Sequence, residues 1–144
     1  MTITWFGLSS FKIVSKDITI ITDPFGKSSG LSPVRGAADI VISSAPNSDL
    51  CNNFSSIQGD PFIINGPGEY DIKGAFIMGT EAENKDLGKI AIYSIEVEDI
   101  RIAFMPHCVP SGAAAVFGGT CVVTSPNRRA FLNPQLPKDQ DEEA

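Results

Sequence analysis

The chain has little of what most enzyme and nucleic-acid sites require. It has one histidine, His107, and its 11 lysines and arginines are outnumbered by 17 carboxylates, for a net charge of −6. Because these cations form no basic stripe, the sequence argues against a nucleic-acid partner. No apolar run approaches the length of a membrane span, and no charged start followed by an apolar core marks a signal peptide. We therefore expect neither nucleic acid nor membrane as a partner.

Cysteine is also scarce. The three cysteines, Cys51, Cys108 and Cys121, are an odd set without C-x-x-C spacing. Such a set predicts free thiols, which are typical of a reducing compartment. We therefore expect a cytoplasmic protein.

The composition indicates one β-rich globular domain. The 144 residues are 42% hydrophobic with 13 glycines, which is enough for a core without metal or disulfide support. The last eight residues, 137–144, carry four carboxylates against Lys138. We therefore expect one domain over 1–136 and a disordered acidic tail over 137–144.

Alternation of apolar and polar residues predicts mostly strands. A tight turn is expected at Glu98-Asp99, and loops at Gly26–Ala37 and Glu81–Leu87. Asn47–Ile57 is expected to form one or two helical turns capped by Ser48 or Asp49. The predicted strands are Thr2–Phe6, Ser10–Val14, Ile18–Thr22, Ile40–Ile42, Pro61–Asn65, Glu69–Ile72, Ala75–Met78, Lys89–Val97 and Ile100–Met105.

Several segments match the motifs of a known family. They are Trp5-Phe6-Gly7-Leu8-Ser9-Ser10-Phe11, Thr22-Asp23-Pro24-Phe25, Gly66-Pro67-Gly68-Glu69-Tyr70-Asp71-Ile72-Lys73-Gly74 and Ile92-Tyr93-Ser94-Ile95-Glu96-Val97. Through them the chain resembles the metallo-β-lactamase fold superfamily, especially the short bacterial "Zn-dependent hydrolase of the β-lactamase fold" proteins and the ascorbate-6-phosphate lactonase-like branch. The resemblance implies an α/β fold, the αββα sandwich of two packed mixed sheets. Here we expect a truncated, strongly β-rich version with few helices, lacking the family's C-terminal third.

The same resemblance shows which side chains are changed. Where the family reads Thr-His-x-His-x-Asp-His, this chain has Ser44 to Leu50, so that Ala45, Asn47 and Leu50 stand at the histidine positions. Only Asp49 is kept. Leu8 replaces a further family histidine, and alanine and leucine offer zinc no lone pair.

The remaining metal candidates are Asp49, His107 and Cys108. The first two fall at positions that would face each other across the family's site, but two ligands do not hold zinc. Adjacent His107 and Cys108 point apart in extended chain, which also argues against a thiol–imidazole pair. Asp49 reads more readily as a helix cap. We therefore predict no catalytic residues, no metal site and no cofactor, with zinc as the alternative.

The corner formed by Gly66, Pro67, Gly68, Glu69 and Tyr70 is interpreted as structural. Glycine and proline set a tight bend, and the following residues alternate as a half-buried strand. Glu69 has no catalytic partner in the sequence.

These observations favour a non-catalytic protein, a pseudoenzyme that acts as a binding or scaffold domain. Missing helices would expose apolar sheet surface, so we expect a protein partner or self-association. The alternative is a metal-dependent hydrolase, lactonase- or β-lactamase-like, with a rebuilt or reduced metal site. A third possibility is a decaying gene product without a selected activity.

Overall fold

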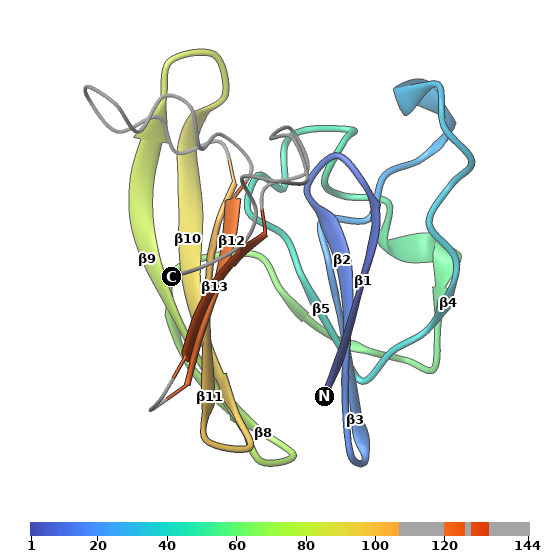
Figure 1. The fold of residues 1–144 in the computed structure, drawn as a ribbon. Helices are drawn as coiled ribbons and strands as arrows, with labels where there is room; N and C mark the ends of the chain where they lie inside the picture. The colour runs from blue at the N-terminus through green and yellow to red at the C-terminus, as the bar shows by residue number, and fades with distance from the viewer. Residues whose placement is uncertain (107–119, 126–127, 133–144) are drawn as a thin grey trace. The chain divides into compact units, whose positions relative to one another are not determined.

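A computed structural model describes residues 1–106, 120–125 and 128–132 of the chain. It divides into two compact units, Met1–Gly66 and Pro67–Ala144. Each unit is built on its own β-sheet (Figure 1). The predicted tail over 137–144 lies outside the described residues.

The first unit contains a five-stranded mixed sheet in the order β1-β2-β3-β5-β7. Strands β1 to β3 are antiparallel neighbours, whereas β5 and β7 run parallel to β3. The predictions for these five strands are confirmed to within one or two residues. The strands are β1 (Thr2–Gly7), β2 (Ser10–Ser15), β3 (Ile18–Thr22), β5 (Ile40–Ile42) and β7 (Phe62–Ile64).

The parallel strands are the most buried part of this sheet. All three residues of β5 are buried, as expected for a short continuous apolar strand with neighbours on both sides. Side chains from β3, β5 and the loop between them, together with Ile57, form one apolar cluster, against which Phe6 and Phe54 pack. The buried members of this cluster are Ile21, Phe25, Val34, Ala38, Val41 and Ile57.

The loops of the first unit contain more structure than predicted. Gly26–Ala37 includes a 3₁₀ turn, η1 (Lys27–Ser29), and strand β4 (Gly36–Ala37), which pairs in parallel with β6 (Ile57–Gln58).

The prediction of one or two helical turns over Asn47–Ile57 is confirmed in part, whereas the predicted cap is wrong. Only the 3₁₀ turn η2 (Phe54–Ser56) forms there, so neither Ser48 nor Asp49 caps a helix. Before η2 the chain makes isolated turns, in which Ser48 N–H bonds the Ala45 carbonyl and Cys51 N–H bonds the Ser48 carbonyl. Serine, asparagine and aspartate favour such local turns over a continuous helix.

The second unit contains a six-stranded antiparallel sheet in which every strand pairs with the next in sequence. The loop prediction for Glu81–Leu87 is wrong at its start, because β9 continues to Asn84 and leaves only a short turn. The strands are β8 (Gly68–Ile72), β9 (Ala75–Asn84), β10 (Gly88–Val97), β11 (Ile100–Met105), β12 (Thr120–Ser125) and β13 (Arg128–Leu132).

The β10–β11 turn is the tight hairpin that was predicted. Glu98 and Asp99 adopt φ of 53° and 61°, the left-handed pair that a two-residue hairpin requires. Among the described residues the only helical segments are the two 3₁₀ turns, so the prediction of a strongly β-rich chain with few helices is confirmed. No helix within those residues has the length and apolar character needed to cross a membrane.

Candidate functional site

The candidate site lies where the parallel strands of the first unit end. Strands β3 and β5 finish at Thr22 and Ile42, and polar residues follow both. The carboxyl edge of parallel strands is the usual place for ligands in layered α/β folds. Asp23 follows β3 directly, and the segment Ser43 to Leu50 follows β5.

Asp23 is the centre of a buried hydrogen-bond network. Its Oδ1 accepts the Ser44 backbone N–H at 2.7 Å. Its Oδ2 accepts the hydroxyls of Ser44 at 2.6 Å and Ser9 at 2.7 Å. The backbone N–H of Asp23 donates to the Ile42 carbonyl at 2.8 Å. One carboxylate therefore joins three segments: the turn before β2, the end of β3 and the end of β5.

The backbone at Asp23 is also unusual. Its φ is 40°, in the left-handed region that aspartate tolerates better than most residues. The fixed carboxylate offsets the cost of this conformation through the bonds that it accepts.

Burial raises the pKa of Asp23 from 3.8 to about 6, despite the lowering effect of the Ser44 and Ser9 bonds. The Cys51 thiol hydrogen-bonds the same carboxylate and is itself buried. Desolvation, and then the charge of Asp23, raise the pKa of Cys51 to about 12. Cys51 is therefore held as a neutral thiol and is a poor nucleophile.

Two further hydroxyls anchor the loops around this carboxylate. Thr22 donates from Oγ1 to the Ser9 carbonyl at 3.0 Å and accepts the Phe11 N–H at 2.9 Å. Ser43 donates from its hydroxyl to the Cys51 carbonyl at 2.8 Å. The segment after β5 is therefore fixed at both of its ends.

The structure separates the residues that stand where the resembled family has histidines. Ala45 is buried, whereas Asn47, Asp49 and Leu50 are exposed. Leu8, in the turn before β2, is also exposed, and its φ is 50°. We would expect a metal ligand to be at least partly buried and a helix cap to bond the first turn of a helix. Asp49 meets neither expectation. His107 and Cys108 lie outside the described residues.

The described donors do not fit a zinc ion. Nowhere in residues 1–106 do three histidine, cysteine, aspartate or glutamate side chains come together in a metal-binding group. The carboxylate of Asp23 is already bonded on both oxygens by Ser9 and Ser44. The arrangement around it can hold loops in place but offers no ligand set for a metal.

In the Gly66–Tyr70 corner, Gly68 has a positive φ and Gly66 does not. Gly68 adopts φ of 151°, and a Cβ there would lie 3.2 Å from Tyr70 Oη. Glu69 is exposed on β8.

Sequence reasoning did not identify the Asp23 network. Its one available signal was an aspartate directly after an apolar strand, within the Thr22-Asp23-Pro24-Phe25 motif. Nothing in the sequence indicates that Ser9 and Ser44 bond the same carboxylate, because they lie 14 and 21 positions from it.

Comparisons with known proteins agree with this description. A family model described as a β-lactamase superfamily domain matches residues 2–132. A solved structure titled as a putative Zn-dependent hydrolase of the metallo-β-lactamase superfamily, from Thermotoga maritima, is similar at 30% identity with a TM-score of 0.56. That match covers 69% of this chain and 45% of the solved chain. No curated protein matches.

Proposed function

This chain belongs to the metallo-β-lactamase superfamily, and on that premise we propose that it is a non-catalytic member that binds another protein through exposed apolar side chains. The proposal rests mainly on the exposure of two leucines that stand where the resembled family has histidines. Leu8 is 45% exposed and Leu50 is 38% exposed. Neither side chain can coordinate a metal, and both present apolar surface to solvent.

The loops that carry these leucines are held at the same edge of the first sheet. Ser9, next to Leu8, and Ser44, at the start of the segment that ends with Leu50, both donate to Asp23. The network that could once have positioned ligands thus positions apolar residues instead.

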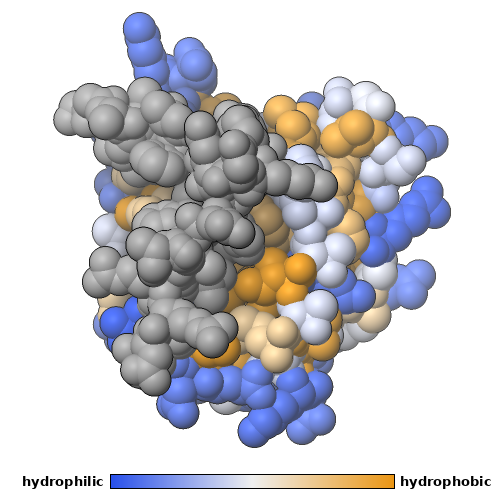
Figure 2. Space-filling view, viewed as in Figure 1, coloured by the Kyte–Doolittle hydropathy of each residue, from blue (hydrophilic) through white to orange (hydrophobic). Residues whose placement is uncertain are grey.

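Leu8 is part of a larger apolar surface. Trp5 is 50% exposed and Leu31 is 47% exposed. Trp5 Nε1 donates to the Leu8 carbonyl at 2.9 Å, and Leu31 lies against Gly7, where a Cβ would be 3.1 Å from Leu31 Cδ1. We call Trp5, Leu8 and Leu31 the turn patch. Apolar side chains are visible at the surface of the molecule in the space-filling view (Figure 2).

Burying such a patch would supply useful binding energy. A leucine side chain that leaves water contributes roughly 1.5–3 kcal/mol, and an exposed tryptophan is a frequent anchor of protein interfaces. A protein surface with complementary apolar residues is therefore the ligand class that this patch fits best.

Elemental analysis of protein purified without chelator tests the non-catalytic part of the proposal. We expect no stoichiometric zinc, and no metal-dependent hydrolysis of a lactone or a β-lactam. One equivalent of zinc with such turnover would contradict the proposal and support the hydrolase alternative.

Sedimentation velocity over a range of concentrations tests the binding part, with a second copy of the chain as the first partner. Leu8→Lys should weaken concentration-dependent association, and lysine tolerates this backbone because Lys16 has φ of 43°. Met78→Lys is the matched control, since Met78 is 41% exposed in the second unit. Equal weakening by both variants would argue against the turn patch.

A further inference from the structure

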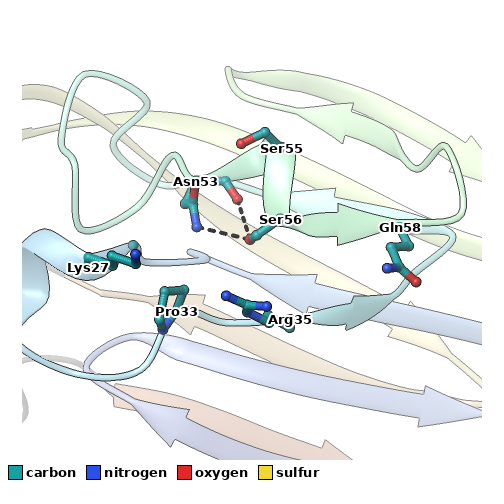
Figure 3. A pocket seen from close by; sticks show the side chains of 8 residues that line it. Lys27, Pro33, Arg35, Asn53, Ser55, Ser56 and Gln58 are labelled. Atoms are coloured by element: carbon teal, nitrogen blue, oxygen red, sulfur yellow. Dashed lines mark hydrogen bonds between the residues drawn. The ribbon is translucent and has the colours of Figure 1, made fainter.

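A pocket of about 590 Å³ lies among the loops of the first unit, and its lining shares no residue with the turn patch or with Ser44 to Leu50. One wall comes from the loop after β3 and carries Lys27, Pro33 and Arg35 (Figure 3). The other wall comes from η2 and β6 and carries Asn53, Ser55, Ser56 and Gln58. Its volume is that of a small-molecule site.

Hydrogen bonds hold the two walls together. Asn53 N–H donates to the Pro24 carbonyl at 2.9 Å. The Ser56 hydroxyl donates to the Val34 carbonyl at 2.6 Å and accepts Asn53 Nδ2 at 2.9 Å. The parallel pairing of β4 with β6 closes one end of the same loops. The pocket is therefore formed before any ligand arrives, which reduces the entropic cost of binding.

The apolar cluster of the first unit supports these walls. Phe25 and Val34 come from the first wall and Ile57 from the second, and all three are buried in that cluster. Phe54, in η2, packs against it. The buried apolar cluster thus supports the backbone that carries the polar side chains of the pocket.

The charge of the pocket is opposite to that of the chain. Lys27 and Arg35 are both exposed, and no aspartate or glutamate of the described part of the chain lines the pocket. Among the described residues no ion pair is recorded for either cation. The net charge of the whole chain is −6, so a pocket lined by two cations differs in charge from the rest of the protein.

We propose that this pocket binds a small organic anion through a phosphate or carboxylate group. Arg35 offers a planar fork of N–H donors that matches either oxyanion, and Lys27 adds a second positive charge. The exposed Ser55 hydroxyl and Gln58 amide supply neutral donors for the rest of the molecule. This inference is independent of the proposed protein-binding function.

Backbone NMR titration with inorganic phosphate, with citrate, and with sodium chloride at matched ionic strength tests the proposal. We expect saturable amide shifts centred on the Gly26–Arg35 loop and residues 53–58, and none with chloride. Phosphate alone, or citrate alone, producing these shifts would support the proposal and identify the recognised group. Shifts that are absent, unsaturable or equal in chloride would overturn it.

Variants assign the binding to these side chains. Lys27→Gln and Arg35→Gln change exposed residues and should not affect folding, and each should weaken binding about tenfold. Lys85→Gln removes an exposed charge from the second unit and is the matched control. Unchanged affinity in the two pocket variants, or equal loss in the control, would also overturn the proposal.

Discussion

The buried carboxylate of Asp23 should make the stability of the first unit depend on pH in a direction opposite to that of most acidic groups. Its pKa is about 6 in the folded chain and 3.8 in the unfolded chain, so the folded chain binds the proton more tightly. The stabilisation is therefore fully present below pH 3.8 and is lost as the pH rises through 6. Since one pKa unit corresponds to 1.36 kcal/mol, the loss is about 3 kcal/mol.

Asp23→Asn should remove this dependence. Asparagine keeps the shape, tolerates the left-handed backbone and can still accept the Ser44 N–H, while the two serine hydroxyls can rotate to accept from its amide. We expect the free energy of unfolding of the variant, relative to the natural chain, to rise by about 3 kcal/mol between about pH 4 and pH 7.5.

Urea unfolding followed by tryptophan fluorescence measures this difference. Trp5 is the only tryptophan of the chain and lies in β1, so its signal reports on the first unit. Comparing variant and natural chain at each pH cancels the titration of all other groups. Asp49→Asn, which changes an exposed carboxylate of the same unit, is the matched control. If Asp23→Asn and the natural chain lose stability in parallel across the range, the assigned burial cost is wrong.

Three further predictions concern stability. Gly68→Val should lower the free energy of unfolding by more than ~1 kcal/mol, because φ of 151° disfavours a side chain and the added Cβ would crowd Tyr70. Gly66→Ala is the control, since nothing lies within 4 Å of a Cβ at that position. An equal effect of both variants would refute the reasoning. EDTA should leave the melting temperature unchanged because the core is apolar, and a drop of several degrees would contradict this. Deletion of residues 137–144 should also leave the melting temperature within error, whereas a clear loss would show that the acidic residues dock.

The strands were predictable because alternation is a local property. The three-residue β5 does not alternate but was recognisable from the continuous apolar run Ile40-Val41-Ile42, which is equally local. The hairpin at Glu98-Asp99 was recognisable from its position between two apolar runs. The start of the Glu81–Leu87 prediction failed because the exposed face of a sheet and a polar loop have similar compositions. There, cross-strand pairing of Glu81 and Glu83 with β10 decides the structure.

Only the position of the candidate site in the sequence was predictable, and not its contacts. The motif comparison located the segment after β5 and identified Ala45 and Leu50 as changed positions. It could not show that Ala45 turns inward and Leu50 outward, since that depends on the turns around Ser48. The motif comparison could not identify the Asp23 hydrogen-bond network, because the fold brings Ser9, Asp23 and Ser44 together from distant parts of the chain.

The order of strands in the two sheets has a consequence for the speed of folding. In the second unit every strand pairs with the one next to it in sequence, and every pairing except β11–β12 closes a loop of only two or three residues. In the first unit the parallel pairs β3–β5 and β5–β7 join strands separated by long connections. Contacts between distant residues slow folding, because the entropy of loop closure opposes them. The antiparallel sheet of the second unit is therefore expected to form early. The parallel pairs of the first unit, at whose carboxyl edge Asp23 lies, are expected to form last.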